Sequence, residues 1–214
     1  MADIGCGRGT TTLQLAQRFP EAQLIAIDLS LAHLQAAQQR LPAGGATLVC
    51  ADFHHLPFAE AGIDVAVAAF CLYHSPRPGL VVAEIARGLD PCGRAIIVTK
   101  SANSYYQLDT LVAASGLDPT ADRRPSLYTS FHSANATRIA GQHLSVRRVI
   151  HQRHIFRFTN LAHLAAYLAT NPKYQLPAEI AAAPQELAAA LRRRVGERTV
   201  TATSTVTYVE AFRP

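Results

Sequence analysis

The residues with the clearest chemical meaning stand near the start of the chain, where one acid is followed by three alternating glycines: Asp3, Gly5, Gly7 and Gly9. Glycines let the backbone approach a ligand closely and adopt angles that other residues rarely adopt. Where such a loop opens a helix, unpaired N–H groups and the positive end of the helix dipole favour an acceptor such as a carboxylate. The G-x-G-x-G spacing differs from the G-x-G-x-x-G of dinucleotide folds, and the preceding acid suits an ammonium group rather than a pyrophosphate. The pattern therefore disfavours a nicotinamide dehydrogenase.

Two further acids follow short apolar runs and extend this pattern. Asp28 ends the run Leu24–Ile27, where a carboxylate can accept hydrogen bonds from both hydroxyls of a ribose. Asp52 follows the run Thr47–Cys50 and stands beside Phe53, so the acid can accept from an exocyclic amine while the ring stacks on a purine. Open α/β sheets bind ligands at the carboxyl ends of their strands. Together, the acids and the glycines predict a site for one nucleoside that bears an amino-acid tail.

The elements that must position these residues are read from apolar runs that alternate with helical patterns, as in βαβ units around a parallel sheet. We expect strands at Ala2–Ile4, Leu24–Ile27, Thr47–Cys50, Ile63–Phe70 and Ala95–Thr99, a helix at Leu80–Leu89 and a turn at Pro91–Gly93. The first helix should be capped by Thr10–Thr12 and should bury a face that includes Phe19. Ser30 should cap the second helix, whose buried side should include Leu31.

The second half of the chain is interpreted as the end of the sheet with a helical insert over the substrate side. We expect helices at Tyr105–Ser115, Ser133–Ala140, Leu161–Thr170 and Gln185–Val195, and strands at Val146–Phe158 and Thr199–Phe212. We predict a single domain over residues 1–214, with a cofactor-binding half at 1–100 and a substrate-side half at 101–214 that holds the insert and the last strands. The predicted fold class is α/β, with a doubly wound, mostly parallel sheet of seven strands.

The composition is typical of a globular protein, with 49% hydrophobic and 16% charged residues. No apolar run reaches the roughly 18 residues that span a bilayer, and no signal-peptide pattern is present. The four cysteines, Cys6, Cys50, Cys71 and Cys92, form no C-x-x-C pair, which fits a reducing cytoplasm and argues against a zinc site or a disulfide scaffold. We therefore expect a cytoplasmic protein with no bound metal and no membrane partner, and the sequence leaves its oligomeric state open.

The formal net charge of +5 raises the question of a polyanionic partner. The basic residues are mostly arginines, grouped as Arg123–Arg124, Arg147–Arg148, Arg153–Arg157 and Arg192–Arg194. These groups fall on separate expected elements, and the chain has only two lysines, Lys100 and Lys173, whereas a nucleic-acid binder usually interleaves such groups with aromatic residues or lysines along one face. We interpret them as solvated surface and do not expect a nucleic acid as partner.

This constellation resembles the class I S-adenosylmethionine-dependent methyltransferase superfamily from Ala2 to about Thr99. The resemblance implies the Rossmann-like methyltransferase fold, S-adenosyl-L-methionine as cofactor and S-adenosyl-L-homocysteine as product. It implies that the glycine loop holds the methionine part, Asp28 the ribose and Asp52 the adenine. The residues that it assigns to cofactor binding are Asp3, Gly5, Cys6, Gly7, Gly9, Asp28, Leu29, Asp52, Phe53 and Phe70.

Two later segments extend the likeness. They are Phe70-Cys-Leu-Tyr-His74 after the fourth strand and the turn Leu89-Asp-Pro-Cys-Gly-Arg94, in which Cys92 replaces a usual glycine. Both look most like the branch of the superfamily that acts on small molecules, including bacterial secondary metabolites. A small-molecule acceptor is therefore expected.

Methyl transfer to a hydroxyl or a carbon acid also needs a base. His74, just past the fourth strand, is the candidate base, and Tyr73 is a candidate for contact with the substrate or the methionine part. The alternative is that His74 only lines the pocket and Tyr73 only packs. His54 and His55 can border the adenine, although exposure on a loop is the simpler interpretation.

Family members normally have residues before this point that complete the first strand and add a helix over the site. The first strand is therefore expected to be truncated, the cleft more open and cofactor binding weaker, which a micromolar or tighter dissociation constant would contradict. The leading hypothesis is an enzyme that methylates a small molecule. An RNA or protein methyltransferase, and a homologue that binds the cofactor without transferring its methyl group, remain alternatives.

Overall fold

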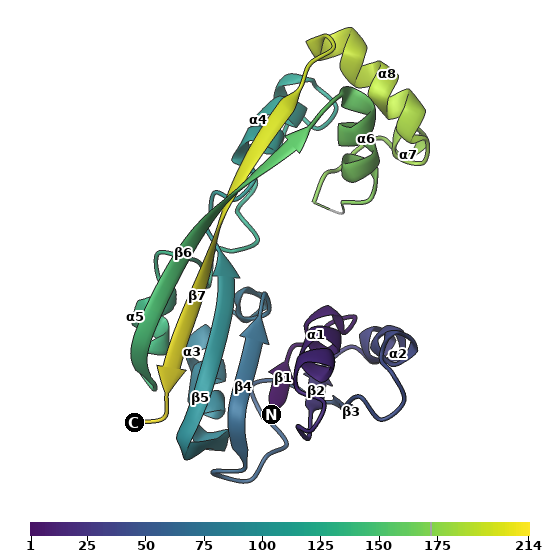
Figure 1. Cartoon of the computed structure of the whole chain (residues 1–214). Coiled ribbons are helices and arrows are strands. Elements are labelled where there is room, and N and C mark those ends of the chain that lie inside the picture. Colours follow the sequence, from purple (N-terminus) through teal and green to yellow (C-terminus); the bar gives the residue numbers. More distant parts are fainter. Residues whose placement is uncertain (172) are drawn as a thin grey trace. The chain divides into compact units, whose positions relative to one another are not determined.

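A mixed β-sheet carries the fold, and helices follow its parallel strands along the chain (Figure 1). The computed structural model describes residues 1–171 and 173–214. Within these residues the strands are β1 (Ala2–Ile4), β2 (Ile25–Asp28), β3 (Thr47–Cys50), β4 (Ile63–Ala69), β5 (Leu89–Lys100), β6 (Ser145–Phe158) and β7 (Val200–Phe212). The helices are α1 (Thr10–Arg18), α2 (Leu31–Arg40), α3 (Pro78–Gly88), α4 (Tyr106–Ala114), α5 (Ala136–Ala140), α6 (Leu161–Ala169), α7 (Ala178–Ala181) and α8 (Pro184–Val195), with a 3₁₀ turn η1 (Leu72–His74).

The strand order β3-β2-β1-β4-β5-β7-β6 confirms the predicted seven-stranded, mostly parallel sheet within the described residues. β1 pairs in parallel with β2 and β4, β2 with β3, and β4 with β5, whereas β7 runs antiparallel to β5. The chain therefore proceeds from β1 to β3 on one side and resumes with β4 on the other. At such a reversal the connections diverge and open a crevice at the carboxyl ends of the strands.

Apolar residues cover both faces of the parallel part of the sheet. Successive residues of a strand point to opposite faces. In β2, Ile27 belongs to the core that includes Ile85 of α3, whereas Ala26 packs with Leu34 of α2. A strand that is covered on both faces is expected to be apolar throughout, which explains the nearly continuous apolar run of β4.

The start of α1 differs from the sequence prediction. Its N-cap is Gly9, in the left-handed conformation with φ of 76° and without a side-chain cap. Thr12 is buried, and its hydroxyl donates to Asp3 at 2.6 Å. The predicted capping by Thr10–Thr12 is therefore wrong for this helix. The predicted burial of Phe19 is also wrong, because the helix ends one residue earlier and the ring is 45% exposed.

The second helix follows the prediction more closely. Ser30 caps α2, because its hydroxyl accepts from the backbone N–H of His33 at 3.3 Å. Leu34 is buried, but Leu31 is 62% exposed, so its predicted burial is wrong. Leu31 is the first residue of the helix, and the core-facing stripe of α2 begins only with Leu34.

The predicted turn before the fifth strand lies inside β5. Leu89 pairs with Ile63, and pairing resumes where Arg94 meets Val65, so residues 90–93 stand opposite one residue of β4. Within this turn the carboxylate of Asp90 accepts from a backbone N–H at 3.0 Å. The strand therefore bulges at the segment that the sequence marks with Pro and Gly.

The described residues form two compact units. Unit 1 comprises Met1–Ala102, Leu127–Gln152 and Val206–Pro214, and unit 2 comprises Asn103–Ser126 and Arg153–Thr205. Along the chain, β6 and β7 each begin in one unit and end in the other. The prediction of a single domain over residues 1–214 stays a prediction.

Unit 2 has its own apolar core, built by Leu108 of α4, Leu164 of α6 and Leu187 of α8. Its helices α4, α6 and α8 match the predicted positions within a residue or two, whereas the short α7 lies where no helix was predicted.

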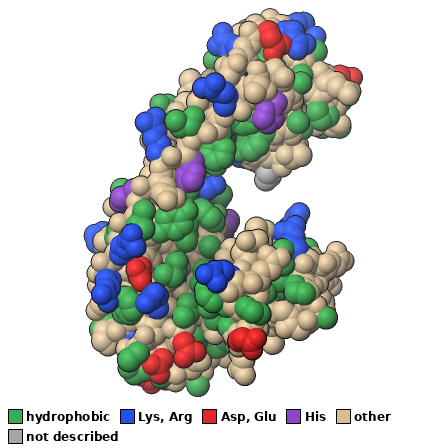
Figure 2. All heavy atoms as spheres, viewed as in Figure 1, with side chains coloured by type: hydrophobic (Ala, Val, Ile, Leu, Met, Phe, Trp, Pro, Cys, Tyr) green, Lys and Arg blue, Asp and Glu red, His purple; other side chains and the backbone are tan. Residues whose placement is uncertain are grey.

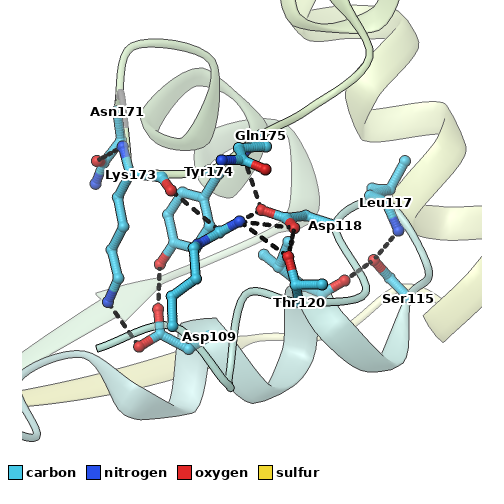
Figure 3. A network of polar contacts seen from close by, with 11 residues as sticks. Asp109, Ser115, Leu117, Asp118, Thr120, Asn171, Lys173, Tyr174 and Gln175 are labelled. Atoms are coloured by element: carbon cyan, nitrogen blue, oxygen red, sulfur yellow. Dashed lines mark hydrogen bonds and ion pairs between the residues drawn. The ribbon is translucent and has the colours of Figure 1, made fainter. Parts of the chain in front are cut away.

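A polar network within unit 2 joins segments that are far apart in the sequence (Figure 3). Asp109 accepts from the ammonium group of Lys173 at 2.6 Å and from the hydroxyl of Tyr174 at 3.0 Å. Asp118 accepts from both terminal nitrogens of Arg124 and from the backbone N–H of Gln175, the latter at 2.8 Å. The network therefore fastens the chain after α6 to the segment that holds α4 and the loop after it.

Basic side chains are spread over the face shown in Figure 2, and some of them lie beside acidic ones. Arg94 pairs with Glu210 at 3.3 Å, and Arg94 and Arg147 lie over the ring of Phe212. In the described part of the chain, no helix has both the length and the apolar character that crossing a membrane requires.

Candidate functional site

A pocket of about 510 Å³ opens within unit 1 at the carboxyl ends of β1, β2, β3 and β4. This is the crevice that the reversal of strand order predicts. The residues that line it are Gly5, Gly7, Ile27, Asp28, Leu29, Ser30, His33, Ala51, Asp52, Phe53, His54, Phe70, Cys71 and His74. Its volume lies in the range of pockets that take small molecules and cofactors.

The glycine loop forms one wall of the pocket. Gly5 and Gly7 have φ of 67° and 54°, a region that other residues rarely adopt. A Cβ on Gly5 would lie 2.5 Å from the Cβ of Cys71, whereas a Cβ on Gly7 would meet no atom within 4 Å. Gly5 is therefore required both by backbone angle and by contact with the β4 loop, and Gly7 by angle alone.

Asp28 connects the glycine loop to the start of α2. Its Oδ2 accepts from the backbone N–H of Gly7 at 2.8 Å, and its Oδ1 accepts from that of Ser30 at 2.9 Å. His33 Nδ1 lies 3.3 Å from the same Oδ1. The carboxylate is thus held in place by two loops while it lines the pocket, as a group that binds two vicinal hydroxyls requires.

Asp52 and His54 form the opposite rim. The backbone N–H and the Nδ1 of His54 lie 2.9 and 2.8 Å from Asp52 Oδ1. These hydrogen bonds lower the pKa of Asp52 below its ordinary value, so this carboxylate is charged at neutral pH. The ring of Phe53 borders the same end of the pocket and provides an apolar surface.

Asp3 lies outside the pocket lining. Its side chain is 1% exposed and accepts from the hydroxyl of Thr12. Burial raises its pKa to about 6, Thr12 acts in the opposite direction, and the negative charge of Asp28 adds to the rise. The predicted contact between Asp3 and an ammonium group stays a prediction.

The segment after β4 brings Phe70, Cys71 and His74 to the pocket. Phe70 has φ of 56°, and the ammonium group of Lys100 lies 5.3 Å from the centre of its ring. The Cys71 thiol donates to the carbonyl of Ile4 at 3.1 Å, and burial raises its pKa, so this sulfur is a packed thiol.

His74 has a lowered pKa, chiefly because burial disfavours the charged imidazole, while Asp28 raises it and His33 lowers it. It is therefore neutral at neutral pH, as a general base must be. Tyr73 does not line the pocket: its ring packs edge-on against Tyr128, and burial raises the pKa of its hydroxyl to about 12.

The structure brings most of the predicted site residues together. Those that line the pocket are Gly5, Gly7, Asp28, Leu29, Asp52, Phe53, Phe70 and His74, and those that do not are Asp3, Cys6, Gly9 and Tyr73. Cys6 is buried and packs with Ala26 and Leu34. A Cβ on Gly9 would lie 2.8 Å from the Cβ of Ala37, so this glycine permits α1 and α2 to approach each other.

Several lining residues were not assigned to the site from the sequence. They are Ile27, Ser30, His33, Ala51 and Cys71, together with His54, for which exposure on a loop was the simpler interpretation. The signal for Ser30 and His33 was the helix start directly after Asp28, since first-turn side chains lie next to the preceding loop. The signal for His54 was its spacing from Asp52, because an acid accepts readily from the backbone two residues on.

Comparisons with known proteins relate this chain to methyltransferases. Residues 2–97 match a protein family described as a methyltransferase domain. The malonyl-[acyl-carrier protein] O-methyltransferase of Herminiimonas arsenicoxydans is 34% identical over 108 residues, which cover 50% of this chain and 40% of that protein. The trans-aconitate 2-methyltransferase of Yersinia pseudotuberculosis serotype O:1b is 54% identical over 54 residues, which cover 25% of this chain and 20% of that protein.

A crystal structure of a protein from Bacillus halodurans C-125 has the same fold, with a TM-score of 0.65 and 16% sequence identity. The match covers 100% of this chain and 91% of that chain. The two enzymes named above, in contrast, are matched over less than half of their own lengths.

The sheet order and the glycine loop with strand-end acids define a Rossmann-like α/β protein with a crevice at the carboxyl ends of its parallel strands. Its residues 2–97 match a methyltransferase domain family, and the chain is similar to methyltransferases over about half of its length.

Proposed function

We propose that this chain binds S-adenosylmethionine in the unit 1 pocket and transfers its methyl group to a small-molecule acceptor. The observation that carries the proposal is the arrangement of Gly5, Gly7, Asp28 and Asp52 around one pocket in a methyltransferase domain. When bound, S-adenosylmethionine supplies a methyl group on a positively charged sulfur. The role of the protein is to orient the two reactants and to exclude water from the reacting centre.

The residues present fit the shape and polarity of this group. The left-handed glycines leave the backbone open to the methionine part, because a Cβ at Gly5 would close the loop against Cys71. Asp28 offers acceptors to the ribose hydroxyls, and Leu29 and Phe53 offer apolar surface to the adenine ring. Asp52 offers an acceptor to the adenine amine.

His74 is proposed to accept a proton from the acceptor molecule where that molecule is a hydroxyl or a carbon acid. Its lowered pKa supports this role, because the neutral imidazole has a free lone pair at neutral pH. An ionised carboxylate needs no base to attack a methyl group. Replacement of His74 by Gln should therefore lower kcat for the first kinds of acceptor and leave it nearly unchanged for a carboxylate.

The two enzymes matched above are named for malonyl-[acyl-carrier protein] and for trans-aconitate. These names support a small, acidic acceptor for this chain and make trans-aconitate a reasonable first probe. The cytoplasmic location predicted from the sequence stays a prediction.

The test combines binding with transfer. Calorimetry with S-adenosylhomocysteine on the 214-residue chain should show one site per chain, and Asp28→Ala should weaken it. Incubation with methyl-labelled S-adenosylmethionine and cell extract should label the small-molecule fraction. Label in RNA, or in protein other than an acyl group carried on an acyl-carrier protein, would contradict the small-molecule acceptor. Tight binding without any transfer would favour a cofactor-binding homologue, and no binding would contradict the proposal.

A further inference from the structure

Three side chains from two segments form a hydrogen-bonded chain at the rim of the pocket. His54 Nδ1 lies 2.8 Å from Asp52 Oδ1, and His54 Nε2 lies 2.8 Å from Ser75 Oγ. The backbone N–H of Arg77, at the start of α3, donates to the same Ser75 Oγ at 2.9 Å. The chain therefore connects the loop after β3 to the loop between β4 and α3.

With a neutral imidazole, the donors and acceptors of this chain have one consistent assignment. A carboxylate only accepts, so the Nδ1 of His54 carries the proton that faces Asp52. Nε2 is then an acceptor, and the Ser75 hydroxyl donates to it while accepting from the Arg77 N–H. The arrangement holds His54 in its Nδ1–H tautomer, because Asp52 can only accept and the Ser75 hydroxyl can then donate to Nε2.

The order Asp–His–Ser is also that of a hydrolase triad, but here it does not serve nucleophilic attack. Ser75 is 1% exposed and is not among the residues that line the pocket. A nucleophilic hydroxyl must reach the carbonyl carbon that it attacks. The buried hydroxyl is therefore an anchor for His54.

The anchor has a direct consequence for Asp52. Its Oδ1 accepts from both the backbone and the ring of His54. Among the residues that the structure describes, Oδ2 of Asp52 has no hydrogen-bond partner. Two donors on one oxygen fix the rotation of the carboxylate and leave the second oxygen available to a ligand.

We propose that His54, anchored by Ser75, is a positioning residue that holds Asp52 so that Oδ2 accepts from the exocyclic amine of adenine. This inference rests on the proposed function, because it assigns the adenine to this end of the pocket. It makes His54 responsible for discrimination between a 6-amino and a 6-oxo purine. The oxygen of a 6-oxo ring is itself an acceptor. It would face the accepting Oδ2 of Asp52 with no hydrogen between the two oxygens, so no hydrogen bond would form there.

The test compares S-adenosylhomocysteine with S-inosylhomocysteine by calorimetry on the full chain. Wild type should bind the adenosyl compound about tenfold more tightly or better. His54→Gln places an amide near the former Nε2 and can keep the Ser75 contact, but it loses the contact with Asp52. In this variant the preference should fall to about threefold or less, with affinity for the inosyl compound nearly unchanged.

His54→Asn is the matched control, because its amide nitrogen can replace Nδ1 toward Asp52, and it should keep most of the preference. Ser75→Ala removes the anchor without touching Asp52 and should lower the preference to an intermediate value. A thermal unfolding midpoint for each variant identifies loss of folding, which would weaken both ligands alike.

The outcomes separate this inference from the proposed function. If wild type binds S-adenosylhomocysteine and His54→Gln keeps the full preference, or loses affinity for both ligands equally, the positioning role is overturned and the cofactor site stands. If wild type binds neither compound, the proposed function fails, and this inference fails with it.

Discussion

Two aspartates in each unit are used in opposite ways. In unit 2, Asp109 and Asp118 are paired with Lys173 and Arg124, so both carboxylates have cationic partners inside the protein (Figure 3). In unit 1, Asp28 and Asp52 accept from backbone N–H groups and line a pocket.

The arrangement in unit 2 contributes to stability, whereas the arrangement in unit 1 leaves carboxylates available to a ligand. A carboxylate that is paired with a cation and accepts from further donors of the protein holds segments together and leaves little acceptor capacity for a ligand. A carboxylate that is oriented by backbone donors at a pocket keeps acceptor capacity for a ligand hydroxyl or amine. Substitutions in the two units should therefore give opposite readouts, and each of the following predictions can break or sharpen this distinction.

The largest effect is expected for Gly5→Ala. The left-handed backbone would cost about 1–2 kcal/mol for any side chain, and overlap with Cys71 would add about 1–3 kcal/mol. Gly7→Ala is the matched control, because it meets the same angular cost without an overlap. Urea unfolding should show a larger loss for Gly5→Ala, and equal losses would contradict the close approach of the two loops.

Asp118→Ala should lower the free energy of unfolding by about 3 kcal/mol, because it leaves the guanidinium of Arg124 without its partner. Affinity for S-adenosylhomocysteine should stay within about twofold, since no ligand role is assigned to this residue. Asp122→Ala, an exposed acid of the same loop, should change stability by less than about 0.5 kcal/mol. A large loss of affinity in Asp118→Ala would break the distinction between the units.

Asp28→Ala should mainly lower the affinity for S-adenosylhomocysteine, with only a small loss of stability. Loss of charged hydrogen bonds to two ribose hydroxyls should weaken S-adenosylhomocysteine binding about 100-fold, and stability should fall by only about 1 kcal/mol. Asp64→Ala, an exposed acid on β4, is the control and should change neither quantity. If the affinity of Asp28→Ala remained at the wild-type value, Asp28 would have no role in holding a ribose.

A smaller effect concerns pH and Asp3. Its folded pKa of about 6 lies above the ordinary aspartate value of 3.8, so the folded protein binds this proton more tightly than the unfolded chain. The stability that this group contributes is fully present below the unfolded value and is lost as pH rises through about 6. Between pH 5 and pH 8, the wild type should lose about 1–2 kcal/mol through this group. Asp3→Asn should lack this component in urea unfolding at the two pH values, and identical pH slopes would contradict the assignment.

Much of the fold could be predicted because the relevant signals are local in sequence. The strand-end acids Asp28 and Asp52 follow apolar runs, and both line the predicted crevice. The helix ends were less predictable: Thr12 looked like a cap, but its hydroxyl turns to Asp3 because the chain there needs a left-handed Gly9. Helix propensity along the sequence does not carry that information, since the conformation of Gly9 depends on how the loop packs against the rest of the chain.

By itself, the sequence determined the alternation of strands and helices around the pocket and predicted the chemical type of the ligand, because glycine spacing and strand-end acids act within a few residues. Only the tertiary structure decided which of these groups reach the pocket. It turned Asp3 inward, brought Cys71 against Gly5, and joined His54 to Ser75. These outcomes depend on contacts between segments that packing alone brings together, and no pattern along the chain records the direction in which a side chain points.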